Sequence, residues 1–95
     1  MSNGRSISSG EITSSQIVKS GAGAISAITI ITDGTNKATI ILYDNTEASG
    51  KKIWEGSVAG TSEYGGRNFV FPVKFDNGLY CAITGTGASS IVEYI

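Results

Sequence analysis

Residues 24–45, AISAITIITDGTNKATIILYDN, decide the fold of this chain. Two runs rich in isoleucine and threonine flank residues 33–36, DGTN, a segment that collects turn-forming residues. Isoleucine and threonine are β-branched, and such side chains favour a pleated strand over a helix. We therefore predict two strands, over residues 25–32 and 38–43, joined as a β-hairpin by the loop between them.

Both faces of this predicted hairpin are apolar. Alternate residues of a strand point to opposite faces, so Ile25 and Ile31 share one face while Ile28 and Ile30 share the other. A half-solvated sheet alternates instead between apolar and polar residues. One face can cover a core, and the second needs another segment of the chain or another subunit. We predict that the second face is buried between subunits.

Turn signals recur at short intervals along the rest of the chain. They separate further predicted strands, which lie at residues 14–20, 51–58, 69–75, 79–84 and 90–95. Pro72 interrupts the third of these, because proline donates no ladder hydrogen bond. The pattern predicts an all-β domain, a single antiparallel β-sandwich (jelly-roll-like) of about seven short strands. Residues 59–68 are predicted to form the longest loop, and the last strand is expected mid-sheet or at an interface.

The N-terminal segment, residues 1–13, is rich in serine and glycine, with Ile7 and Ile12 as apolar anchors. This composition predicts a flexible or partner-anchored arm, followed by a β-sandwich domain at residues 14–95. The alternative is that the segment folds back along its own sheet as an edge strand. If it is an arm, its candidate contact residues are Arg5, Ile7 and Ile12.

The composition favours no chemistry. Charged residues make up 16% of the chain and the net charge is −1, with basic residues scattered along it, so no nucleic-acid partner is expected. Histidine, the commonest general base, is absent. No apolar run of about 18 residues or signal-peptide h-region occurs, so no membrane association is expected. We predict a protein that is not an enzyme and has no cofactor or metal ion.

Each candidate for chemistry has a simpler structural interpretation. Asp33, Asp44 and Asp76 lie in separate predicted turns beside glycine or asparagine, which favours turn geometry over a calcium site. Residues 85–87, GTG, lack the lysine of a phosphate-binding loop, so a hairpin turn is predicted. Cys81 lies mid-strand and has no histidine to deprotonate it, so we predict a packing residue.

Aromatic residues offer the best candidates for a binding surface. Tyr64, Arg67 and Asn68 lie in the predicted loop, where they form a candidate surface-contact site. An exposed aromatic ring beside such polar side chains can stack on a sugar or anchor a protein interface. Plain solvent exposure is the alternative for this loop. For Trp54 we predict a place in the core.

Four stretches of the chain have a recognisable pattern: LYDNTEASGKKIW at residues 42–54, FDNGLYCAITG at 75–85, SIVEYI at 90–95 and KSGAG at 19–23. Together they resemble small proteins encoded among the virion genes of tailed bacteriophages. The resemblance covers residues 14–95, and its motifs are turn-and-strand signatures that specify a fold more than a function. No catalytic residues carry over.

The resemblance implies a virion structural protein, most simply a homo-oligomeric (trimeric) capsid decoration or cement protein that binds and stabilises the capsid shell. Its implied partners are further copies of itself and the major capsid protein or other virion proteins. Its implied location is the capsid surface, after synthesis in the host bacterial cytoplasm. The alternative is a carbohydrate-binding or host-recognition β-sandwich module of a phage fibre.

Overall fold

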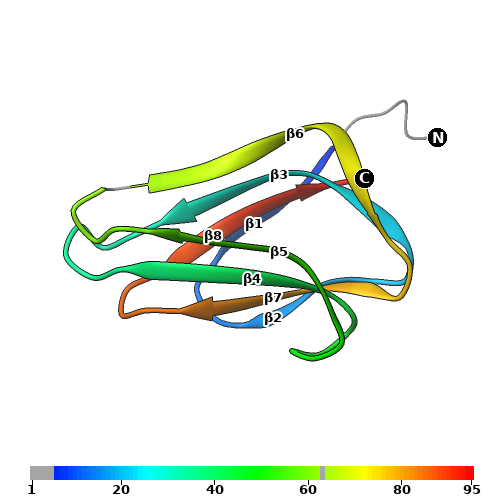
Figure 1. The fold of residues 1–95 in the computed structure, drawn as a ribbon, viewed down its shortest axis with the longest axis horizontal. Helices are drawn as coiled ribbons and strands as arrows, with labels where there is room; N and C mark the ends of the chain where they lie inside the picture. Colours follow the sequence, from blue (N-terminus) through cyan, green and yellow to red (C-terminus); the bar gives the residue numbers. More distant parts are fainter. Residues whose placement is uncertain (1–5, 63) are drawn as a thin grey trace.

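The computed structural model describes residues 6–62 and 64–95, which form eight strands in two packed four-stranded antiparallel sheets (Figure 1). The predicted all-β sandwich is confirmed. The described part of the chain holds no helix long and apolar enough to cross a membrane. The strands are β1 Ile7–Ile12, β2 Gln16–Ser20, β3 Gly23–Ile31, β4 Ala38–Asp44, β5 Lys51–Val58, β6 Tyr64–Phe75, β7 Gly78–Thr84 and β8 Ser89–Tyr94.

The strand order follows from one long antiparallel ribbon folded over on itself. The first sheet has the order β1-β8-β3-β6 and the second has the order β2-β7-β4-β5. Strands that follow one another in the chain therefore change sheet, except β4 and β5, which are neighbours. This wrapping of eight strands around one core is that of a jelly roll.

The predicted hairpin over residues 24–45 is wrong, because β3 and β4 belong to different sheets. The turn at residues 33–36 carries the chain across the sandwich. Within this turn the carboxylate of Asp33 accepts hydrogen bonds from the backbone N–H groups of Thr35 (2.9 Å) and Asn36 (2.8 Å). The tight hairpin of the chain is instead β4–β5, in which Leu42 lies opposite Trp54.

A β-bulge at Ser26 changes which side chains of β3 face the core. Ile25 pairs with Tyr94 of β8, and Ala27 pairs with the adjacent Glu93, so Ser26 is an extra residue. A bulge of this kind shifts the alternation by one position. Ile25, Ile28 and Ile30 are consequently all buried. The prediction of a second apolar face assumed that the side chains of β3 alternate between the two faces without interruption. The bulge at Ser26 breaks this alternation, so β3 does not have the second apolar face as it was predicted.

The core lies between the two sheets and draws residues from both. Its buried apolar members are Ile12, Ile25, Ile28, Ile30, Ala38, Ile40, Leu42, Phe75, Leu79, Cys81, Ala88 and Val92. Along β4 the buried residues Ala38, Ile40 and Leu42 alternate with half-buried ones, as a strand with one face on a core should. By contrast β2, which falls within the strand predicted at residues 14–20, lies at a sheet edge and exposes Ile17.

Residues 7–12, assigned from composition to an arm, form β1 and pair with β8 along the edge of the first sheet. Ile7 lies opposite Tyr94 and Ile12 opposite Ser90. The hydroxyl of Ser9 accepts a 2.9 Å hydrogen bond from the backbone N–H of Val92. This part of the segment therefore follows the alternative prediction of an edge strand, and the sandwich begins before residue 14. Because β8 lies between β1 and β3, the expected mid-sheet position of the last strand is confirmed.

The four edge strands β1, β2, β5 and β6 are all irregular. Each contains extra residues relative to the neighbour with which it pairs: the register shifts between Ser8 and Glu11 in β1 and between Ile17 and Lys19 in β2. In β5 the extra residue is Ile53, between Lys52 and Trp54. The largest irregularity, in β6, forms the first candidate site.

Candidate functional site

The first candidate site is a segment of β6 that leaves the sheet. Asn68 pairs with Ala27 and Val73 pairs with Ile25, so the four residues 69–72 lie opposite the single residue Ser26. The chain bends outward at this point (Figure 1). The displaced segment contains Pro72, which lacks the N–H that a regular ladder requires.

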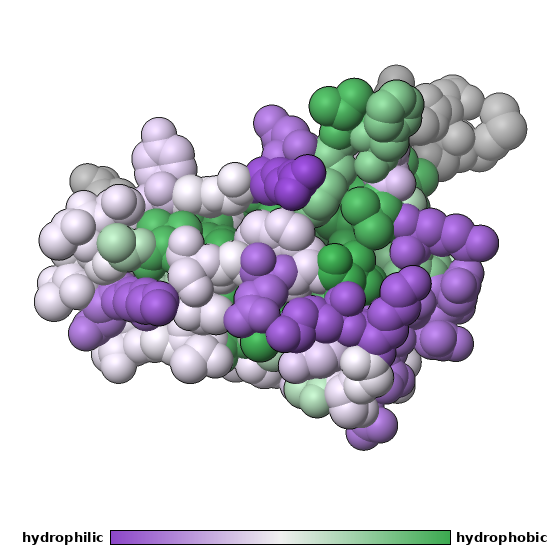
Figure 2. Space-filling view, viewed as in Figure 1, coloured by the Kyte–Doolittle hydropathy of each residue, from purple (hydrophilic) through white to green (hydrophobic). Residues whose placement is uncertain are grey.

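This bend places two large apolar side chains in solvent. Val70 is 88% exposed and Phe71 is 84% exposed. Hydrophobic residues project from the upper edge of the molecule at the bend of β6 (Figure 2). We call Val70, Phe71 and Pro72 the β6 knob. Pro72 is predicted from the sequence as a strand interruption, but the exposure of Val70 and Phe71 is not, because it depends on the bulge opposite Ser26 and not on a local sequence pattern.

A hollow of about 400 Å³ lies beside the knob, between the free edges of the two sheets. Its lining combines β5 and β6 residues: Ile53, Trp54, Arg67, Asn68, Phe69, Val70, Phe71 and Val73. We call it the β5–β6 groove. Arg67 places its guanidinium carbon 5.1 Å from the centre of the Phe69 ring, a cation–π contact that keeps this long side chain along the groove.

Trp54 forms part of the groove wall. Its indole is half-buried and packs against the core, as predicted, while part of it lines the groove. The ring lies across Gly56, so that a Cβ added to Gly56 would lie 2.7 Å from ring atom Cζ2. Glycine at position 56 therefore allows the indole to close the gap between the sheets.

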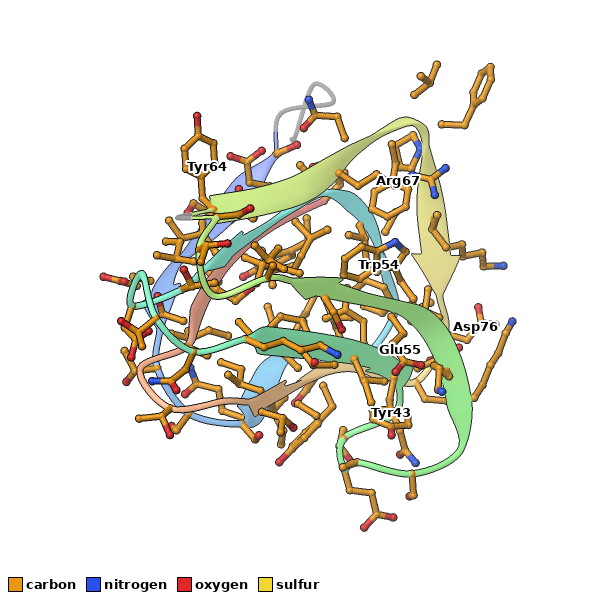
Figure 3. All side chains as sticks on the ribbon, turned by 60° about the vertical axis from the view of Figure 1, so that its left-hand side comes forward. Tyr43, Trp54, Glu55, Tyr64, Arg67 and Asp76 are labelled. Atoms are coloured by element: carbon orange, nitrogen blue, oxygen red, sulfur yellow. The ribbon has the colours of Figure 1, made fainter. Side chains whose placement is uncertain are left out.

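The second candidate site is a hollow of about 660 Å³ beside Tyr64, the first residue of β6. It is lined by Thr29, Ile31, Thr32, Asp33, Gly34, Thr61 and Tyr64. Tyr64 is 74% exposed, and its ring projects away from the sheet (Figure 3). We call this site the Tyr64 hollow.

The structure divides the three predicted surface residues between these sites. Tyr64, Arg67 and Asn68 lie on strand β6 and not in a loop, because Gly65 and Gly66 pair with Ile30 and Thr29 of β3. All three line a shallow hollow of about 360 Å³ along β6. Arg67 and Asn68 also line the β5–β6 groove, whereas Tyr64 lines the Tyr64 hollow.

The predicted contact residues of the N-terminal segment have different positions. Ile12 is only 7% exposed and belongs to the core, so little of its side chain is available to a partner. Ile7 is exposed at the start of β1. Arg5 lies outside the described residues.

The aspartates serve as turn residues. Among residues 6–62 and 64–95, no three potential ligands gather to hold a metal ion. Asp44 and Asp76, predicted to lie in separate turns, meet: the Asp44 carboxylate accepts the backbone N–H of Asp76 at 3.0 Å. The pKa of Asp44 is lowered, mainly by a hydrogen bond from the backbone N–H of Asn77. For Asp33, hydrogen bonds from Asn36 lower the pKa in the same way.

Cys81 is fully buried in the core, as predicted for a packing residue. Burial raises the pKa of its thiol to about 12, so the reactive thiolate is scarce at neutral pH. Residues 85–87, predicted to form a hairpin turn, lie instead in the connection that joins β7 and β8 across the two sheets. The two surface sites are thus suited to binding a partner or a ligand. The β5–β6 groove adjoins the apolar β6 knob, and the Tyr64 hollow combines an aromatic ring with polar groups.

Comparison of the chain with protein-family models, with curated proteins and with solved structures finds no match in any of the three.

Proposed function

We propose that this chain is a virion structural protein of a tailed bacteriophage, a homo-oligomeric capsid decoration protein that holds neighbouring shell subunits together. The observation that carries the proposal is the β6 knob. Val70 and Phe71 project from an otherwise complete sandwich, where they contribute nothing to the core. Apolar side chains so exposed mark a surface that a partner covers.

A few side chains would contribute most of the binding free energy of such a contact. Burying a side chain of the size of valine or phenylalanine is worth about 1.5–3 kcal/mol each. A large aromatic residue at the centre of an interface is a typical energetic hot spot. Phe71 would therefore supply much of the affinity, while the surrounding polar residues exclude water.

The adjacent β5–β6 groove supports self-association through the same region. Its lining includes Ile53, Trp54 and Val73, which offer an apolar surface to the knob of a second copy. A knob-to-groove contact joins two different surfaces, and such contacts form a ring when the rotation between copies closes. The net charge of −1 leaves little repulsion between copies. These features support a closed ring of copies, and the trimer that the sequence resemblance implies is one such ring.

The virion location rests on the resemblance of residues 14–95 to phage proteins. The jelly-roll fold is consistent with it, because viral capsid domains are among the proteins that use this fold. Lectin domains use it too, so the fold alone does not decide the function.

Purified particles that lack this gene product test the proposal by add-back. The wild-type chain should co-sediment with them saturably, whereas Phe71→Ser should lose binding. Ile17→Ser is the matched control, because Ile17 is also exposed but lies on β2, at the other edge of its sheet from β5. Absence of the protein from purified wild-type particles, or equal binding by Phe71→Ser, would overturn the proposal.

Light scattering tests the oligomeric part separately. At micromolar concentration the wild-type chain should have the mass of a trimer, and Phe71→Ser should shift toward the monomer mass. A stable wild-type monomer would contradict self-association. Shell binding by that monomer would leave attachment through the knob as the surviving part of the proposal.

Residues 1–5 of the predicted arm keep their proposed role in shell contact. Deleting residues 1–13, as the composition first suggests, would remove β1 as well and confound attachment with folding. Truncation of residues 1–5 leaves β1 whole, and we expect it to weaken co-sedimentation. Unchanged co-sedimentation after this shorter truncation would assign attachment to the folded sandwich alone.

A further inference from the structure

The Tyr64 hollow lies at one end of the sandwich, where strands β3 and β6 and residues from two connections, 32–37 and 59–62, line it. A third connection, residues 85–88, packs against the first of these. Two glycines allow this close approach. A Cβ added to Gly60 would lie 2.7 Å from the backbone nitrogen of Asn36. A Cβ added to Gly87 would lie 2.7 Å from Cβ of Asp33, and Gly87 has a positive φ of 70°. The absence of side chains at both positions lets the three connections pack directly against one another.

Thr32 fastens two of these connections together. Its hydroxyl donates a 2.7 Å hydrogen bond to the carbonyl oxygen of Ser62 and accepts a 3.1 Å hydrogen bond from the backbone N–H of Gly34. Thr32 itself is buried. Residues 60–62 are therefore tied to the turn that carries Asp33.

The carboxylate of Asp33 is held in one orientation. One oxygen accepts the backbone N–H groups of Thr35 and Asn36, and the other accepts the side-chain N–H of Asn36 at 2.8 Å. Each carboxylate oxygen has two acceptor sites. The oxygen bonded only to the Asn36 side chain thus keeps capacity for an incoming hydroxyl group.

Tyr64 supplies the apolar part of the hollow. It is largely exposed, and the next two residues, Gly65 and Gly66, have no side chains beside its ring. Thr61 and Thr29 add hydroxyl groups to the same lining. An aromatic face therefore adjoins a fixed carboxylate and hydroxyl groups.

We propose that the Tyr64 hollow binds a neutral carbohydrate, with one sugar ring stacked on Tyr64 and its hydroxyl groups bonded to Asp33 and Thr61. A sugar ring combines an apolar face with a polar edge, which matches this lining. An anionic ligand such as a phosphate would face the Asp33 carboxylate with no basic residue among the lining residues. The volume of about 660 Å³ lies within the usual range of ligand pockets, roughly 300–1,000 Å³.

This inference is independent of the proposed structural function, because it uses different residues. The knob and the groove lie around residues 53–54 and 67–73, whereas the hollow involves Tyr64 and the connections at the end of the sandwich.

Amide NMR spectra of the whole chain test the proposal with glucose, galactose, mannose and N-acetylglucosamine as separate probes. At least one should give saturable shifts at Gly34, Thr61 and Tyr64, with a dissociation constant of about 1 mM, typical of a weak site. Tyr64→Ala should weaken binding by about two- to twelvefold, the change that corresponds to an aromatic stacking contact of about 0.5–1.5 kcal/mol. Tyr64→Phe keeps the ring and should retain most of the affinity.

Two controls separate this site from the rest of the surface. Phe71→Ser should bind the sugar as the wild-type chain does, because Phe71 does not line the hollow. N-acetylneuraminic acid, which is anionic, should bind at least about tenfold more weakly than the best neutral sugar. No saturable shift with any of the four neutral probes would overturn the proposal, as would shifts that persist unchanged in Tyr64→Ala.

Discussion

The carboxylate of Asp44, at the end of β4, accepts a 2.8 Å hydrogen bond from the backbone N–H of Asn77. The adjacent N–H of Asp76 donates to the same carboxylate at 3.0 Å. Asp44 belongs to one sheet, and the turn at residues 76–77 leads from β6 of the other sheet into β7. A single buried side chain therefore satisfies two backbone donors of the turn and ties it to the hairpin strand.

Replacing this carboxylate should destabilise the fold. Asp44→Ala leaves the two backbone N–H groups without their acceptor, and an unsatisfied buried donor costs about 1–3 kcal/mol. We expect a loss of that size in the free energy of unfolding, measured by urea denaturation. Asp76→Ala is the matched control: within the described part of the chain its side chain makes an exposed 3.3 Å ion pair with Lys74, so its loss should stay within about 0.5 kcal/mol. Equal losses in the two variants would contradict this account.

The contribution of Asp44 should depend on pH with a defined sign. Because the pKa of Asp44 is lowered in the folded chain, its stabilising effect is present above the unfolded pKa, about 4, and is lost as pH falls through the lowered folded value. The stability gap between the wild-type chain and Asp44→Ala should therefore be constant between about pH 5 and 7 and narrow below about pH 4. Thermal melts across this range measure the gap. A gap that widens toward acid pH would refute the assignment.

Two phenylalanines four positions apart should behave in opposite ways. Phe75 is fully buried, so Phe75→Ala should cost about 3–5 kcal/mol of unfolding free energy. Phe71 is almost fully exposed, so Phe71→Ala should change it by no more than about 0.5 kcal/mol. Chemical denaturation of the two variants at a concentration where the chain is monomeric makes the comparison. A large loss in Phe71→Ala would mean that the knob supports the fold and is not reserved for a partner.

Gly56 should be intolerant of even a methyl group. In Gly56→Ala the new Cβ would meet the indole of Trp54, which would have to move outward from the gap between the sheets. We expect a loss of about 1–3 kcal/mol, the usual cost of overpacking. Trp54 is the sole tryptophan, so a red shift of fluorescence emission reports the movement directly. Ser57→Ala, at the neighbouring exposed position, should leave the emission maximum unchanged.

Much of the fold could be predicted from the sequence, because strand formation depends on local residue types. The ranges 38–43, 51–58 and 79–84 nearly coincide with β4, β5 and β7. The pairing of strands could not be predicted as well. The DGTN sequence suits the turn of a hairpin and a connection between two sheets equally well. The strands that pair with β3 are β6 and β8, which lie far from it in the sequence.

The remaining errors share a physical cause. The hydrogen bonds that pair two strands join backbone groups, so they depend little on which side chains the strands carry. Strand β1 has the composition of a flexible segment, yet its backbone groups pair with β8. Gly65 and Gly66 lie within the loop predicted at residues 59–68 but belong to β6. Glycine suits position 66 because a Cβ there would run into the carbonyl oxygen of Ile28. The knob was missed because its exposure follows from the bulge opposite Ser26, which no local pattern reveals.

The candidate sites were predicted in part. The surface position of Tyr64 could be predicted from residue type alone, because its neighbours in the sequence are glycines and polar residues that do little to bury an aromatic ring. Asp33 was interpreted only as a turn residue, because its proximity to Tyr64 depends on the meeting of segments distant in the sequence.

The irregular edges of both sheets affect what happens when copies of this molecule lie close together. A straight, regular edge strand is a template on which another chain can add a strand, and this risk rises with local concentration. Each of the four edges here is interrupted by extra residues, in β6 by the whole segment 69–72. Copies crowded side by side can therefore meet through side chains and separate again, without their backbones fusing into a continuous sheet.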